Sequence, residues 1–75
     1  MSRIWRPERG MKVRLTNTGF GQVRLRSREE ARAAVEGVVV TGVSRAYTEP
    51  ECWNVDLAPP LDAFLFTSQD VERVS

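Results

Sequence analysis

Two stretches near the start of the chain, KVRLT at 12–16 and QVRLR at 22–26, alternate polar and apolar residues with a period of two. That period is typical of a β-strand with one face buried and the other in water. Between them lies NTGFG at 17–21, whose asparagine and two glycines favour a turn. The sequence therefore predicts a β-hairpin over 12–26, with its valines and leucines buried and its basic residues exposed.

The exposed face of this predicted hairpin carries a row of cations. Side chains directly opposite in an antiparallel pair lie about 4.5–5.5 Å apart, so like charges would meet across the strands and gain most from an arriving anion. Arginine binds carboxylate and phosphate with two parallel hydrogen bonds. An apolar contact at the hairpin tip would come from Phe20. The predicted partner-binding residues are Lys12, Arg14, Phe20, Arg24 and Arg26.

Charge is divided unevenly along the chain. Residues 1–28 hold eight basic residues and one acid, whereas residues 29–75 hold three basic residues and nine acids. Such a division indicates an anionic partner. One alternative is that the two halves neutralise each other within the fold. Another is that the basic residues of the predicted hairpin only prevent aggregation at an exposed strand edge. Residues 1–10 are expected to form a tail, since Pro7 and Gly10 interrupt any regular pattern. In that tail Arg3, Trp5 and Arg6 are candidates for further contacts, unless Trp5 folds back or frays.

The rest of the chain predicts one helix and three strands. Ser27 and Glu30 form a capping-box pattern at the start of a helix that should end before Gly37. Strands are expected at 38–47, with a bulge or bend at Gly42, at 52–57, with Cys52 facing outward, and at 64–66. A tight turn follows at 67–70, and the chain has no linker, so residues 11–75 are expected to form a single small β-rich domain.

In order and length these elements resemble the SH3-like barrels of small accessory subunits, such as the peripheral stromal subunit of photosystem I and the variable chain of ferredoxin–thioredoxin reductase. The resemblance covers 11–75 and rests on the basic strand at 12–16, GVVVTGV at 37–43, WNVDL at 53–57 and FLF followed by VERV at 71–74. It implies a non-catalytic protein that docks on a larger one. The expected fold is mainly β, a small, partly open SH3-like barrel with one short helix. The helix and the hairpin depart from that pattern and keep an α+β alternative open, a ββαβββ antiparallel sheet with the helix on one face.

The chain lacks the residues that several kinds of site require. Histidine is absent and Cys52 is the single cysteine, which excludes histidine-based triads, zinc sites and disulfide frameworks. The glycines at 19 and 21 are too few for a phosphate-binding loop. We therefore expect no catalytic residue, no metal, no cofactor and no small-molecule substrate in a chain of 75 residues. No apolar run approaches the ~20 residues of a membrane span, and the first residues lack a secretory apolar core, so a cytoplasmic protein is expected.

These observations predict a non-enzymatic binding module or accessory protein that docks, through the basic hairpin face, on a larger protein complex with an acidic surface. Nucleic-acid binding by the same face together with the arginine-rich tail is the alternative. A small phage- or plasmid-encoded inhibitor of a nucleoprotein machine is a weaker alternative, which the size of the chain permits.

Overall fold

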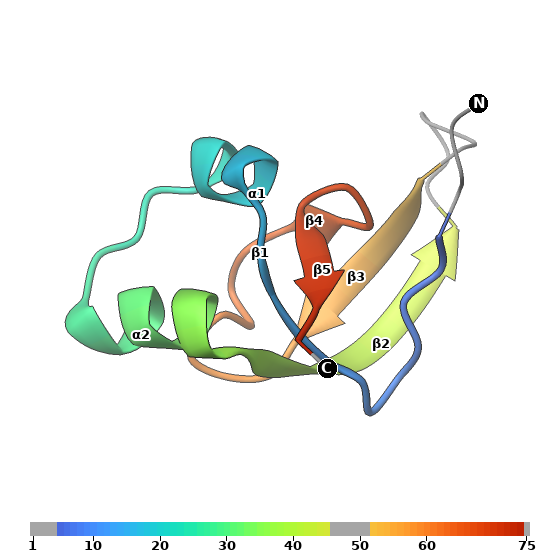
Figure 1. Cartoon of the computed structure of the whole chain (residues 1–75), viewed down its shortest axis with the longest axis horizontal. Coiled ribbons are helices and arrows are strands. Elements are labelled where there is room, and N and C mark those ends of the chain that lie inside the picture. Colours follow the sequence, from blue (N-terminus) through green and yellow to red (C-terminus); the bar gives the residue numbers. More distant parts are fainter. Residues whose placement is uncertain (1–4, 46–51, 75) are drawn as a thin grey trace.

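In the computed structural model, which describes residues 5–45 and 52–74, antiparallel strands and two short helices follow one another along the chain (Figure 1). The strands are β1 (Lys12–Leu15), β2 (Val38–Arg45), β3 (Trp53–Leu57), β4 (Phe66–Thr67) and β5 (Val71–Arg73). The helices are α1 (Asn17–Gln22) and α2 (Arg28–Glu36). The predicted mainly β fold with a short helix near 28–36 is confirmed, and α1 was not predicted.

The strands form one sheet in the order β4-β3-β2-β1-β5, and the sheet is not closed. The long strand β2 pairs with β1 through its first residues, as in Val13↔Val38, and with β3 through the remainder, as in Val43↔Val55. The pairing with β3 shifts register between Val40 and Gly42, which is the predicted bulge. On its other side β1 pairs with β5, so both edges of β1 are covered.

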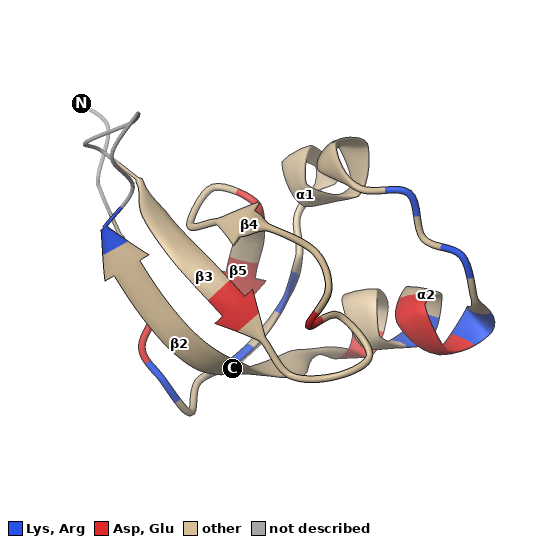
Figure 2. Ribbon diagram, turned by 180° about the vertical axis from the view of Figure 1, so that it is seen from behind, with Lys and Arg blue, Asp and Glu red and all other residues tan. Residues whose placement is uncertain are grey.

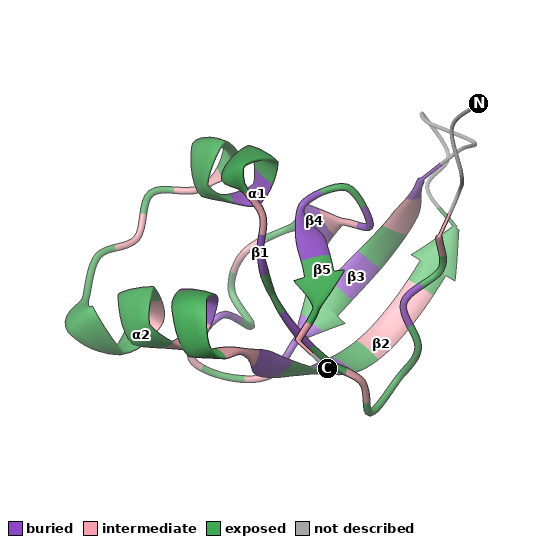
Figure 3. Ribbon diagram, viewed as in Figure 1, coloured by how far each residue is buried: buried purple, intermediate pink, exposed green. Residues whose placement is uncertain are grey.

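The core lies on one face of this sheet, and buried and exposed residues alternate along its strands (Figure 3). Side chains from every strand, from α2 and from the loop before β4 contribute to it. The buried apolar residues of this cluster are Val13, Leu15, Ala34, Val38, Val40, Val55, Leu57, Leu61, Phe66 and Val71. Strand β4 begins later than predicted, and Leu65 just before it is exposed. Cys52 does not face outward as predicted, because it is 1% exposed.

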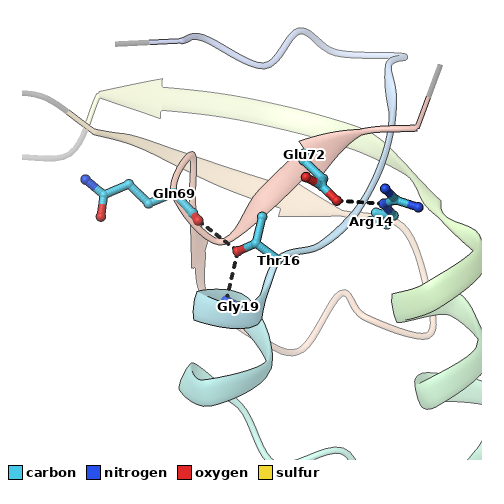
Figure 4. Close-up of polar contacts among 5 residues, drawn as sticks. All are labelled: Arg14, Thr16, Gly19, Gln69 and Glu72. Atoms are coloured by element: carbon cyan, nitrogen blue, oxygen red, sulfur yellow. Dashed lines mark hydrogen bonds and ion pairs between the residues drawn. The ribbon is translucent and has the colours of Figure 1, made fainter. Parts of the chain in front are cut away.

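The predicted hairpin over 12–26 is wrong. Residues 17–22 form α1 instead of a turn, and residues 23–27 pair with no strand. Helix α1 begins where the Thr16 hydroxyl accepts a hydrogen bond from the Gly19 amide at 3.2 Å (Figure 4). The two edges of β1 are occupied by β2 and β5, whose apolar residues lie far away in the sequence. A local alternation identifies an extended, half-buried segment but carries no information about its partner strand.

Helix α2 has the predicted boundaries. The Ser27 hydroxyl accepts a hydrogen bond from the Glu30 amide at 3.1 Å, and the Glu30 carboxylate accepts one from the Arg26 amide at 2.6 Å. The carboxylate thus reaches one residue further back than in a standard capping box. Gly37 follows the helix with φ 115°, a backbone angle that favours glycine.

The described part of the predicted tail, residues 5–10, packs against the sheet. The Trp5 indole donates a hydrogen bond to the Ser68 carbonyl oxygen at 2.7 Å, and Pro7 is buried. The Gly10 amide donates to the Val40 carbonyl at 2.8 Å. Trp5 therefore folds back onto the domain instead of fraying or extending from it as a free contact. Arg3 and residues 46–51 lie outside the described residues.

Candidate binding surface

The five residues predicted to bind a partner do not share one face of a hairpin. Lys12 and Arg14 lie on β1, Phe20 lies on α1, and Arg24 and Arg26 lie on the connection between the two helices. Figure 2 shows basic residues on this connection at one end of the molecule and others on the strands. The expectation that like charges meet across two paired strands is therefore wrong, because β1 and residues 23–27 are not paired.

Arg14 is already neutralised within the fold. It lies directly opposite Glu72 in the β1–β5 pairing, and its Nε donates to the Glu72 carboxylate at 2.7 Å (Figure 4). Both side chains are about half exposed, at 51% and 49%. An exposed pair of this kind contributes roughly 0.2–1 kcal/mol to stability and leaves little free positive charge for a partner.

The connection between α1 and α2 keeps the alternation that the sequence showed, although it is not a strand. Val23 and Leu25 are partly buried and pack against the core, whereas Arg24 and Arg26 are exposed. Arg28, the first residue of α2, is exposed as well and continues the spacing of two. Sequence reasoning missed Arg28 because it assigned this residue to the helix, yet the unbroken spacing from Arg24 was visible. We call Arg24, Arg26 and Arg28 the arginine connection.

The arginine connection differs from Arg14 and Arg32 in lacking ion pairs among the described residues. Within residues 5–45 and 52–74, neither Arg24, Arg26 nor Arg28 forms an ion pair with a carboxylate, whereas Arg14 and Arg32 do. The partner of Arg32 is Glu36, one turn further along α2, at 3.5 Å. Each side chain of the arginine connection is therefore available to an external anion.

One exposed aromatic side chain lies on the helix before these cations. Phe20 is 39% exposed and lies on α1, four residues before Arg24. It is thus a large ring left partly in water on α1, the helix that directly precedes the arginine connection (Figure 1). Its role as an apolar contact stays a prediction.

A second cluster of cations surrounds Trp53 at the opposite end of the sheet. The guanidinium carbon of Arg6 lies 4.6 Å from the centre of the Trp53 ring, and that of Arg45 lies 5.9 Å from it. Both distances fall within the range of a cation–π interaction. Arg6, predicted as a tail contact, is therefore placed over an aromatic ring instead of in a free tail.

The described residues contain no cluster of metal ligands, no exposed cysteine and no helix that could span a membrane. They contain no group of three or more side chains that could hold a metal ion. Cys52 is buried, and the chain has no histidine that could activate its thiol. In the part of the chain that the structure covers, no helix reaches the length and apolar character needed to cross a bilayer.

Comparison with known proteins adds no relative, since no family model, no curated protein and no solved structure matches this chain.

Proposed function

We propose that this protein is a non-enzymatic binding module that docks on a larger protein with an acidic surface through the arginine connection. The observation that carries the proposal is the row of three exposed arginines, two residues apart, that form no ion pair with the described carboxylates. The docking role that an SH3-like accessory subunit would have agrees with this proposal.

The geometry of the connection suits recognition of a row of anions. Along an extended chain, residues two apart lie about 6.6 Å from each other on the same side. The backbone between them is anchored, because Val23 and Leu25 pack against the core. An anchored segment loses less conformational freedom on binding than a free loop does, so more of the interaction energy appears as affinity.

An acidic protein is favoured over nucleic acid because an apolar residue accompanies the cations. Interfaces between proteins combine an apolar centre with a charged rim, and aromatic residues and arginine are enriched in them. Phe20, at 39% exposure, supplies such an apolar element on the helix that precedes the arginine connection. A nucleic-acid site would gain most of its affinity from phosphates, and its binding would fall steeply with salt.

The proposal is tested by affinity capture from lysate of the producing cells, with and without nuclease, using three forms of the protein. The wild type is compared with Arg24→Gln/Arg26→Gln and with a control of equal charge change, Arg14→Gln/Arg32→Gln, in which the lost cations are ion-paired. We expect a protein partner that survives nuclease, is retained by the control and is lost from the first variant. Loss of the captured partner after nuclease would instead establish nucleic-acid binding, and equal capture by all three forms would refute both.

A further inference from the structure

The edge of β2 that faces away from β3 is only partly covered. Strand β1 pairs with Val38 and Val39, and the chain just before β1 continues this pairing to Val40. At Val40 the amide donates to the Met11 carbonyl and the carbonyl accepts from the Gly10 amide, both at 2.8 Å. Beyond Val40 no described strand pairs with this edge of β2.

Hydrogen bonds elsewhere in the sheet show where the peptide groups of β2 point. The Ser68 amide donates to the Trp53 carbonyl at 2.8 Å, so the peptide groups of Trp53 face β4. Because peptide groups alternate along an antiparallel strand, those of Asn54 face β2, where Asn54 is paired with Ser44. Val43, next to Ser44, therefore directs its own N–H and C=O away from β3, toward the open edge.

A groove lies along this open edge. It has a volume of about 450 Å³ and separates β2 from the segment before β1, which runs beside β2 (Figure 1). Its lining is Arg6, Pro7, Glu8, Arg9, Thr41, Gly42 and Val43. A volume of this size is within the range of sites that hold ligands. Two guanidinium groups against one carboxylate give the groove a positive balance, and one of them, that of Arg6, also lies over the Trp53 ring.

We propose that this groove binds an extended, acidic peptide segment of a partner protein as an added strand on β2. The Val43 N–H and C=O would bond the peptide backbone, as in other cases of strand addition to an open edge. Arg6 and Arg9 would bind its carboxylates. A second copy of this chain is a poor occupant, because antiparallel pairing of two β2 edges would bring the same cationic rim against itself.

This surface is distinct from the arginine connection. The segments that line the groove, β2 and the chain before β1, lie away from the connection between α1 and α2 (Figure 2). The inference therefore goes beyond the proposed function and does not depend on it. A protein that binds at both surfaces could bridge two acidic segments.

Amide hydrogen exchange followed by nuclear magnetic resonance tests the proposal on the full chain. The probe is an eight-residue peptide of alternating glutamate and valine. Its controls are the same peptide with lysine for glutamate, and the glutamate peptide with N-methyl groups on every second residue, which removes backbone donors without changing charge. We expect the glutamate peptide to slow exchange of the Val43 amide at least tenfold and neither control to do so.

Two variants distinguish peptide binding in the groove from peptide binding at the arginine connection. Arg6→Gln/Arg9→Gln should weaken peptide binding by about fivefold, from two exposed charge pairs. Arg24→Gln/Arg26→Gln should leave protection of Val43 unchanged, even if the peptide also contacts the arginine connection. An unchanged Val43 amide at saturating peptide, equal protection by a control peptide, or protection that grows with protein concentration in the absence of peptide would each overturn the proposal.

Discussion

Replacing Gly19 by alanine is the sharpest test of how α1 docks on the sheet. A Cβ atom at this position would overlap the carbonyl oxygen of Asp70 and lie 3.0 Å from its carbonyl carbon. Both atoms belong to backbone, so no side-chain rotation relieves the overlap. The helix or the turn before β5 must move, which threatens the hydrogen bond from the Thr16 amide to the Asp70 carbonyl at 2.9 Å.

Gly21 supplies a matched control in the same helix, because a Cβ there meets nothing within 4 Å. Glycine to alanine at a permissive helical position stabilises by about 0.4–1 kcal/mol. At Gly19 the same gain is offset by overpacking, which costs about 1–3 kcal/mol and sometimes more. Since the clash is between backbone atoms, we expect Gly19→Ala to destabilise by about 2 kcal/mol and the two variants to differ by about 3 kcal/mol.

Urea unfolding followed by tryptophan fluorescence measures this difference. With a slope near 1 kcal/mol per molar urea for so small a domain, the two midpoints should differ by about 3 M. In a thermal scan Gly19→Ala should melt roughly 8–16 °C below the wild type. Equal stability of the two alanine variants would show that α1 does not approach Asp70 as described.

Three further predictions concern the core and the segment before β1. Phe66→Ala removes a side chain that is 2% exposed and should lower the free energy of unfolding by about 3–5 kcal/mol. Leu65→Ala, at a side chain that is 90% exposed, should change it by less than about 0.5 kcal/mol. A reversal of this order in urea unfolding would refute the register of β4. Trp5→Phe keeps an aromatic ring but removes the indole N–H with its 2.7 Å hydrogen bond to the Ser68 carbonyl, together with part of the packed ring system. It should therefore cost at least about 0.5–1.5 kcal/mol, and an unchanged midpoint would show that the bond contributes nothing. The Cys52 thiol, at 1% exposure, should react with a thiol reagent only as fast as the domain opens, and immediate stoichiometric reaction in the folded state would contradict its burial.

Features that depend on neighbouring residues could be predicted from the sequence. The start and end of α2 follow from Ser27, Glu30 and Gly37, each within one helical turn of the group that it caps. The bulge at Gly42 and the inward direction of Val55 and Leu57 follow from local composition and the two-residue period.

Features that depend on distant residues could not be predicted from the sequence. The alternation at 23–26 correctly indicated which side chains face water, but the sequence placed the segment beside β1, where β2 and β5 in fact lie. Helix α1 contains two glycines, which have low helix propensity, so nothing local favoured it except the capping position of Thr16. Its docking on Asp70 provides the contact that a local pattern cannot show.

The same nonlocal pairing restricted what could be predicted about binding. The exposure of Arg24 and Arg26 could be predicted from the two-residue alternation alone. The pairing of Arg14 with Glu72 requires β5 to lie beside β1, across a separation of 58 residues. The groove along β2 requires the bulge, the pairing with β3 and the path of the first described residues together.

The position of β5 beside β1 has a consequence for biosynthesis. A nascent chain that lacks Val71–Arg73 leaves one edge of its first strand uncovered. The hydrogen bond of the Trp5 indole also cannot form until the Ser68 carbonyl, 63 residues later, has been synthesised. Such long closures slow folding, and an uncovered edge invites pairing with other chains. The domain is therefore expected to complete its sheet only once Val71–Arg73 have left the ribosome, and a delay in translating these residues would prolong its exposure to aggregation.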